Sequence, residues 1–195
     1  MNTRPEHDTA TVERRIAPAR SFATLLLGLC AASPALPSET LFGDTQAQRC
    51  YQSASSNTTS LTAVEACDDA LSSEPLSDRD RAATYANRGI ILARRNRLEE
   101  AIRSYDRAID IEPAMVHALI NRANAYTRMN RFEDALDDYG QALFYSQGRD
   151  PLVFYNRSLA YEKLGRKAEA REDLVRALQL QPESRQIRDA LVALD

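Results

Sequence analysis

The acidic residues Glu133, Asp134, Asp137 and Asp138 are the densest cluster of groups in this sequence that could do chemistry. Two carboxylates held close together can act as general acid and base, and a larger set can bind calcium. No apolar segment of the sequence is placed to form an opposing pocket around them. We therefore expect these four residues to form a solvated outer face of a helix, balanced weakly by nearby arginines such as Arg131.

The remaining catalytic residue types give no recognisable site. His117 is the only histidine beyond the N-terminal segment, and a lone histidine is more often an exposed helix residue than a ligand. The sequence contains no Cys-x-x-Cys pair, no glycine-rich phosphate loop and no Gly-x-Ser-x-Gly elbow. We therefore expect neither catalytic residues, nor a metal site, nor a cofactor.

Three asparagines recur at a nearly constant spacing: Asn87, Asn121 and Asn156, separated by 34 and then 35 residues. An amide side chain carries both donors and an acceptor, which suits the backbone of an extended peptide. The same amides could instead form hydrogen bonds within the protein. The sequence alone leaves both roles open.

These asparagines mark an internal repeat, in which Ala101 returns as Ala135 and Ala170. Each unit contains two helical patterns separated by a short polar break. Pro113 and Pro182 cannot continue a helix, so they mark the ends of units. A period in the thirties is typical of stacked repeats, and three full units suffice for a continuous core.

The repeat resembles the tetratricopeptide repeat (TPR). That family places a bulky, a small and an aromatic residue on the first helix, and alanine, aromatic, alanine and proline on the second. The matching residues here are Tyr85, Gly89, Leu92, Ala101, Tyr105, Ala108 and Pro113; Leu119, Ala123, Tyr126, Ala135, Tyr139 and Ala142; Phe154, Ser158, Tyr161, Ala170, Leu174, Ala177 and Pro182. Four residues depart from the pattern: Leu92, Ser158, Leu174 and Gln147. The last of these stands where the second proline is expected.

The resemblance implies an all-α fold, a right-handed solenoid of antiparallel helix pairs. Its three full repeats are expected at 82–115, 116–150 and 151–184. Residues 44–81 contain alanines and a proline at the spacing found in the second helix of each repeat. They therefore predict a degenerate N-terminal repeat, which follows a linker at 36–43. Residues 185–195 carry apolar positions at i, i+3, i+4 and i+7, which predict an amphipathic capping helix.

In TPR proteins the first helices line a concave groove that carries the recognised peptide, so the resemblance implies a protein or peptide partner there. Positions spaced i, i+3, i+4 and i+7 share one helix face. The groove residues expected here are Asn87, Ile90, Arg94, Ile120, Asn121, Asn124, Arg128, Leu152, Tyr155, Asn156 and Leu159.

One TPR subgroup clamps a C-terminal carboxylate with basic groove residues, and this sequence departs from it. Ala86, Leu152 and Asn156 stand where those basic residues are expected. We therefore expect that a free carboxylate is not the main determinant of binding. The C-terminal half of the groove is apolar, through Ile120, Leu152, Tyr155 and Leu159, and Arg94 and Arg128 form a basic edge. We expect a ligand with apolar or aromatic anchors and some acidic character.

Residues 1–35 are typical of a secretory signal. Arginines precede an apolar run at 22–32, and Ser33-Pro34-Ala35 offers a cleavage site. The run is too short to span a bilayer, which needs roughly 20 residues. We expect a periplasmic or secreted protein without a membrane span in the mature chain. The alternatives are twin-arginine export, a buried N-terminal helix and a lipoprotein anchored through Cys30.

Removal of residues 1–35 would leave two cysteines, Cys50 and Cys67. An even pair in an exported chain predicts a disulfide, and the pair lies in the unit with the weakest apolar core. These cysteine positions also resemble those of exported bacterial TPR proteins. Two free buried thiols are the alternative.

Composition excludes one further class of partner. The formal net charge is −3, and no basic stripe interleaved with aromatic residues suggests nucleic-acid binding. An alternative to groove binding is a structural or accessory subunit of an envelope complex, docked through its convex face or terminal helix. The sequence determines neither the partner nor the oligomeric state.

Overall fold

The computed structural model of this protein describes residues 45–56 and 60–194, all within one compact unit. The predicted signal sequence at 1–35 and linker at 36–43 lie outside these residues. The described elements are α1 (Gln46–Ser55), α2 (Leu61–Ser73), α3 (Asp78–Arg94), α4 (Leu98–Ile111), α5 (Val116–Arg128), α6 (Phe132–Tyr145), α7 (Pro151–Lys163), α8 (Lys167–Leu180) and α9 (Arg185–Ala193). None of these helices is both long and apolar enough to cross a bilayer.

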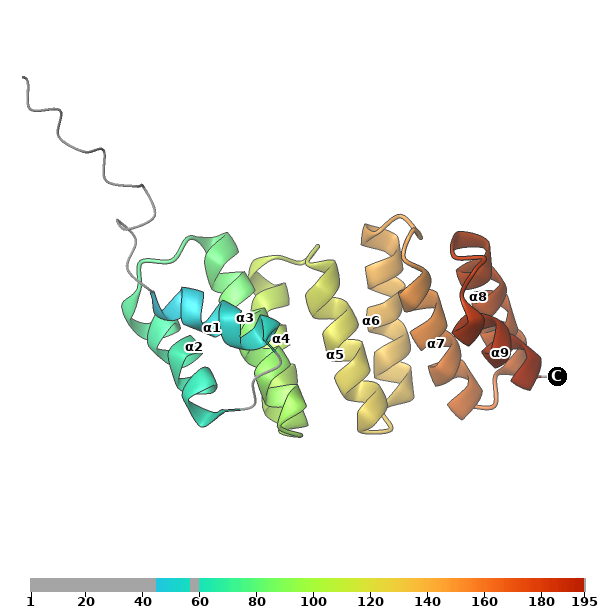
Figure 1. Cartoon of the computed structure of the whole chain (residues 1–195), viewed down its shortest axis with the longest axis horizontal. Helices are drawn as coiled ribbons and strands as arrows, with labels where there is room; N and C mark the ends of the chain where they lie inside the picture. The colour runs from blue at the N-terminus through green and yellow to red at the C-terminus, as the bar shows by residue number, and fades with distance from the viewer. Residues whose placement is uncertain (1–44, 57–59, 195) are drawn as a thin grey trace, which may run out of the picture. The chain divides into compact units, whose positions relative to one another are not determined.

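The helices pack as successive pairs, α1 with α2, α3 with α4, α5 with α6 and α7 with α8, and α9 packs on α8 (Figure 1). Each second helix also contacts the first helix of the next pair. In addition, the first helices contact one another, α1 with α3, α3 with α5 and α5 with α7. They form one continuous row, and we call the face that this row presents the inner face. The predicted all-α solenoid of helix pairs is confirmed.

The turn inside each full pair uses one residue in the left-handed region: Asn96 (φ 61°), Asn130 (φ 60°) and Gly165 (φ 74°). Glycine and asparagine tolerate this region best, so they are the residues expected just after a helix end. In the first of these turns, the Arg97 N–H donates to the Leu92 carbonyl at 3.0 Å. Because the same turn recurs, the three pairs have matching geometry.

Side-chain caps fix where several helices begin. Ser60 accepts from the Thr62 N–H, Ser77 from Asp80 and Asp150 from Leu152. Each cap satisfies a backbone donor that has no partner inside the helix. Because Ser77 is the cap, α3 begins at Asp78, four residues before the predicted repeat at 82–115.

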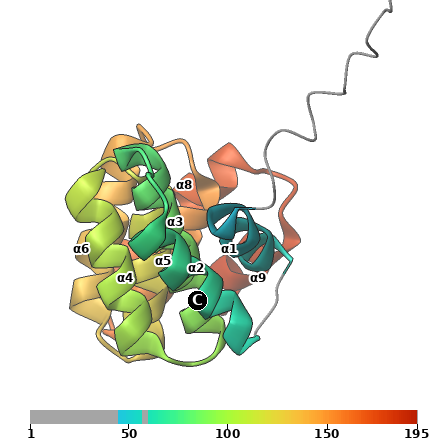
Figure 2. The ribbon, with the colours of Figure 1, turned by 90° about the vertical axis from the view of Figure 1, so that its left-hand side faces the viewer.

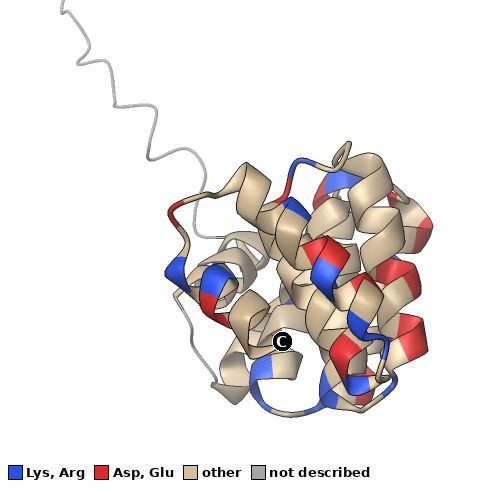
Figure 3. Cartoon of the chain, turned by 90° about the vertical axis from the view of Figure 1, so that its right-hand side faces the viewer, with Lys and Arg blue, Asp and Glu red and all other residues tan. Residues whose placement is uncertain are grey.

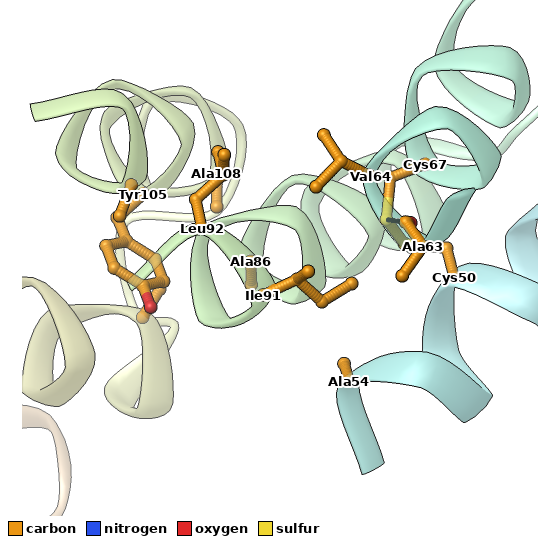
Figure 4. Close-up of a cluster of buried hydrophobic side chains, with 12 residues drawn as sticks. Cys50, Ala54, Ala63, Val64, Cys67, Ala86, Ile91, Leu92, Tyr105 and Ala108 are labelled. Atoms are coloured by element: carbon orange, nitrogen blue, oxygen red, sulfur yellow. Dashed lines mark hydrogen bonds between the residues drawn. A yellow bond between two sulfur atoms is a disulfide. The ribbon is translucent and has the colours of Figure 1, made fainter. Parts of the chain in front are cut away.

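Close helix packing depends on small residues opposite large ones. The Tyr105 side chain is 1% exposed and lies against Gly89, where an added Cβ would be 2.4 Å from Tyr105 Cε1. Figure 4 shows this ring within the cluster that joins α1–α5. The equivalent pairs are Ala123 with Tyr139 and Ser158 with Leu174, all fully buried.

Cys50 of α1 and Cys67 of α2 form a disulfide with an S–S distance of 2.10 Å (Figure 4). Both cysteines are completely buried, and the Cys50 sulfur lies 3.8 Å from the Thr84 carbonyl oxygen of α3. The bond therefore joins the two helices of the N-terminal pair at the point where α1 packs against α3. Viewed end-on, α1 lies on the side opposite α4 and α6 (Figure 2).

Candidate functional site

A hollow of about 320 Å³ opens on the inner face between α3 and α5, and we call it the α3/α5 hollow. It is lined by Ile90, Ala93, Arg94, Tyr105, Asn121, Asn124, Ala125 and Arg128. Five of the eleven predicted groove residues are therefore brought together at one place. They reach it because residues at i, i+3, i+4 and i+7 of each first helix share a face.

Two arginines of the α3/α5 hollow are held in place by backbone oxygens. The Arg94 Nη1 donates to the Ala54 carbonyl at 2.6 Å, and the Arg128 Nη1 donates to the Ala93 carbonyl at 2.7 Å. Arg128 also donates to Asn96 Oδ1 at 3.0 Å. In both cases the acceptor carbonyl lies near the end of the preceding first helix, where carbonyls lack helical partners.

These contacts leave donors for a ligand. Arg94 and Arg128 are both exposed, and a guanidinium has more N–H groups than these bonds use. Planar guanidinium groups bind carboxylates with paired hydrogen bonds. The two arginines therefore form an ordered basic edge that suits a carboxylate. Lys163 holds the equivalent, exposed position in the third full unit.

The asparagines of the inner face divide into two groups. Asn124 Oδ1 accepts from the Tyr139 hydroxyl at 2.6 Å and from Asn156 Nδ2 at 3.2 Å. Burial raises the pKa of Tyr139 to about 12, so its hydroxyl stays protonated and donates at neutral pH. Within the described residues, Asn87 and Asn121 form no side-chain hydrogen bond in the protein. Asn156 is thus an internal link between units, whereas Asn121 is open to a ligand.

Several predicted groove residues lie outside the α3/α5 hollow. Ile120 is 8% exposed and belongs to the core cluster around Tyr139. Tyr155 packs against the cluster of α8 and α9, and Leu159 is half-buried. Leu152 is exposed at the start of α7. The predicted apolar C-terminal half of the groove is therefore partly used for internal packing.

A second inner-face hollow, of about 670 Å³, lies between α1 and α3, and we call it the α1/α3 hollow. It is lined by Thr45, Ala47, Gln48, Tyr51, Glu74, Pro75, Leu76, Asp80, Ala83, Thr84 and Asn87. Only Asn87 was among the predicted groove residues. Gln48 and Tyr51 are spaced i and i+3 on α1, so extending the same face pattern into the degenerate repeat would have found them.

Within the helix pairs, arginines of the first helix form ion pairs with largely buried acids of the second helix. Arg122 binds both oxygens of Asp138 and one oxygen of Asp106, each at 2.7 Å. Arg157 binds Asp173 in the same bidentate manner. The hydrogen bonds that Arg122 donates to Asp138 raise the pKa of Arg122, so the guanidinium remains charged. These pairs fix how the helices of a unit face one another.

This arrangement corrects the prediction that the acidic cluster at 133–138 is a solvated face. Asp138 is only 2% exposed, although Glu133 and Asp137 are exposed and Asp134 pairs with Arg131 at 2.9 Å. The correct partner of Asp138, Arg122, lies 16 residues away on the preceding helix. Viewed towards α9, acidic and basic residues are both present over the visible helices (Figure 3).

Within the described residues, no group of three or more histidine, cysteine or acidic side chains is placed to hold a metal ion. The Asp138 carboxylate is occupied by Arg122, so it is not available as a general base in this arrangement. The chemistry that the inner face offers is hydrogen bonding, charge pairing and apolar contact.

Sequence models of the tetratricopeptide repeat match three segments of the chain, residues 82–115, 116–143 and 151–184. A similar curated protein is a DnaJ homolog subfamily C member 7 homolog of Dictyostelium discoideum, with 29% identity over 122 residues. The match covers 63% of this chain and 22% of that protein, so the chain spans about a fifth of its relative's length.

Two solved structures illustrate the similarity in three dimensions. The second TPR domain of human RPAP3, determined in complex with the HSP70 peptide SGPTIEEVD, has 29% identity and a TM-score of 0.58. The match covers 60% of this chain and 98% of that domain. A tetratricopeptide repeat protein of Parabacteroides merdae has 26% identity and a TM-score of 0.68, over 78% of this chain and 59% of the other.

Proposed function

This chain is a tetratricopeptide repeat protein, and on that premise we propose that it is a non-catalytic interaction module that binds a peptide segment of a partner protein on its inner face. The α3/α5 hollow is the centre of the binding site. The observation that carries this proposal is the combination, in one hollow, of the open Asn121 amide with two ordered arginines, Arg94 and Arg128.

Each part of the hollow suits a different part of an extended peptide. The Asn121 amide can both donate to and accept from a peptide backbone. The Arg94 and Arg128 guanidinium groups suit a carboxylate, and Ile90 offers an apolar surface beside them. The ligand is therefore a segment with an acidic residue and neighbouring apolar side chains.

The acidic group is a side chain rather than a chain terminus. The peptide bound to the human RPAP3 domain, SGPTIEEVD, is also acidic. In this chain, however, Ala86 is buried, Leu152 is exposed and apolar, and Asn156 is bonded to Asn124. None of the three supplies the positive charge that a terminal carboxylate would require, so an amidated peptide is expected to bind as well as a free acid.

Selection from a phage-displayed library of random dodecapeptides tests this function. Enriched peptides, synthesised with amidated ends, are expected to contain Asp or Glu beside an apolar residue. The Asn121→Ala or Arg128→Ala variant should weaken their binding about ten- to hundredfold, the range for losing one hydrogen bond to a charged or backbone group. Titration calorimetry measures the change, and circular dichroism verifies that the helices remain.

The matched control is Lys163→Ala, which removes the equivalent positive charge from the third full unit. It should change the affinity less than about threefold, because Lys163 does not line the α3/α5 hollow. If no peptide is enriched, or if Asn121→Ala and Arg128→Ala bind as tightly as the unsubstituted protein, the hollow is not a peptide site.

We further propose that the protein acts after export, as residues 1–35 indicate, and that the Cys50–Cys67 bond forms in an oxidising compartment. Intact-mass measurement of the protein from its native host tests both points. The expected mass is that of residues 36–195, about two daltons below the value after reduction. A full-length N-terminus, a lipid attached to Cys30, or no change on reduction would contradict this proposal.

A further inference from the structure

We propose that the α1/α3 hollow is a second subsite for the same peptide, and that it takes an aromatic or large aliphatic side chain. This inference rests on the function proposed above and adds a sequence requirement to it. The two side chains of the ligand, one apolar and one acidic, are expected about four positions apart.

The α1/α3 hollow has an apolar part of its lining that the described residues leave uncovered. Tyr51 is 56% exposed, and Ala47, Pro75, Leu76 and Ala83 line the hollow with it. An exposed aromatic ring beside a concave apolar surface is typical of the anchor sites at which a few residues provide most of the binding energy. The hollow therefore offers a place for one large apolar side chain.

The charges around this hollow exclude an acidic ligand group. Its charged lining residues are Glu74 and Asp80, both acidic. Glu74 accepts from the Gln46 and Ala47 N–H groups at the start of α1, and Asp80 accepts from the Ser77 hydroxyl. A carboxylate would be repelled here, whereas the α3/α5 hollow attracts one through Arg94 and Arg128. The two hollows thus select different side chains of one segment.

Asn87 connects the two subsites. It lines the α1/α3 hollow, its side chain makes no hydrogen bond within the described part of the chain, and it corresponds to Asn121 in the next unit. Both amides face the inner surface on neighbouring first helices. A peptide that crosses α3 from one hollow to the other can therefore bond to both amides through its backbone.

The distance between the hollows sets the spacing in the ligand. Asn87 and Arg94 are seven residues apart on α3, which is about 10 Å along its axis. The crossing from one side of α3 to the other is perpendicular to this axis and measures about 8–10 Å, so the two distances combine at right angles. The resulting separation of about 14 Å equals about four residues of extended peptide at about 3.3 Å each. In an extended chain, side chains four positions apart point to the same side, as this arrangement requires.

The N-terminal hairpin is what creates this subsite. Tyr51 directly follows Cys50, whose bond to Cys67 holds α1 on α2, and Arg94 holds the end of α1 through the Ala54 carbonyl. The degenerate repeat therefore extends the binding surface beyond the three full units, and its disulfide positions the aromatic wall.

A set of acetylated, amidated dodecapeptides tests the proposal. Each peptide has a glycine–serine background, one fixed Glu, and one Phe placed one to six positions from the Glu on either side. Titrations monitored by ¹H–¹⁵N correlation spectra measure dissociation constants into the millimolar range. Phe four positions from Glu, on one side, should strengthen binding about ten- to hundredfold over the peptide without Phe, as expected for burying one large apolar side chain.

Two variants and one control identify the subsite. Tyr51→Ala, and Ala83→Leu, which fills the hollow, should each reduce the gain from Phe to less than about threefold while leaving the Glu-only peptide unaffected. Leu61→Ala removes a similarly exposed apolar side chain (59% exposed) from α2, outside both hollows, and should change nothing.

The outcomes separate the two proposals. If Glu shifts the amides around Arg94 and Arg128 but the position of Phe has no effect, the subsite is wrong and the proposed function stands. If no peptide in the set shifts an inner-face amide, both are wrong. If the unsubstituted protein sediments as a dimer and Tyr51→Ala as a monomer, a second copy covers Tyr51, and this also overturns the subsite.

Discussion

The Arg122→Met variant is expected to lose about 3–5 kcal/mol of unfolding free energy, because it leaves the buried Asp138 carboxylate without a partner. The Asp138 side chain is 4% exposed and receives two hydrogen bonds from Arg122, each of 2.7 Å. Urea unfolding followed by circular dichroism at 222 nm measures the loss.

A matched surface pair gives the control for this prediction. Arg131 and Asp134 form an ion pair in which both side chains are 47% exposed. Arg131→Met should therefore cost no more than about 1 kcal/mol. The double variant Arg122→Met/Asp138→Leu should recover most of the lost stability, since it removes the unpaired charge. Equal losses for Arg122→Met and Arg131→Met would contradict the account of the buried pair.

The same variant should respond to pH in a definite direction. Burial raises the pKa of Asp138, and the hydrogen bonds and charge of Arg122 oppose that rise. Without Arg122 the pKa rises further, so the folded state binds a proton more readily than the unfolded state. Stability of Arg122→Met should therefore increase as pH falls from 7 towards 5, because protonation removes the buried charge.

The second large effect concerns two glycines whose replacement by alanine should have opposite results. At Gly89, the new Cβ would lie 2.4 Å from Cε1 of the buried Tyr105 ring, so Gly89→Ala should cost about 1–3 kcal/mol by overpacking. At Gly140, inside α6, a Cβ would meet nothing within 4 Å. Gly140→Ala should therefore stabilise the helix by about 0.5–1 kcal/mol.

A compensating variant tests the cause of the first effect. Gly89→Ala combined with Tyr105→Leu imitates the natural pair of Ser158 with Leu174 in the third full unit. It should be more stable than Gly89→Ala alone if the clash with the ring causes the loss. The same thermal or urea unfolding experiment compares all four proteins. If Gly89→Ala and Gly140→Ala shift stability in the same direction, the close approach of Gly89 to Tyr105 is not what limits packing.

The fold could be predicted from local rules. The spacing of Ala101, Ala135 and Ala170 identified the units, and the short polar breaks identified the turns, where Asn96 and Asn130 adopt positive φ. Helix propensity, capping and turn chemistry act within a few residues, so a single sequence displays them directly.

The site could be predicted only in part, because it depends on contacts between units. Arg94 and Arg128 lie on the inner face because of their helix spacing, which the sequence displays, but their bonds to the ends of the preceding first helices follow from the stacking distance. Asp138 was misassigned because its partner is on another helix. The link between Asn156 and Asn124 likewise joins residues of two units, and no spacing within one helix reveals it.

The α1/α3 hollow was missed for a related reason. The degenerate repeat shares only part of the family pattern, so the face pattern of the other first helices was not extended to α1, although the i, i+3 spacing of Gln48 and Tyr51 follows it. Its geometry is set by the Cys50–Cys67 bond and by the packing of Cys50 near the Thr84 carbonyl. These are tertiary constraints, and they place Tyr51 where a ligand can reach it.

Photocrosslinking in the native host tests whether a partner peptide binds the inner face. A photoreactive amino acid replaces either Ile90, in the α3/α5 hollow, or Arg107, exposed on α4. We expect a crosslinked partner from position 90 and none from position 107. Mass spectrometry of the adduct should locate the bond in a segment that contains Asp or Glu near an apolar residue. A crosslink from position 107 together with none from position 90 would contradict groove binding, and the partner would then be docked on the outer face.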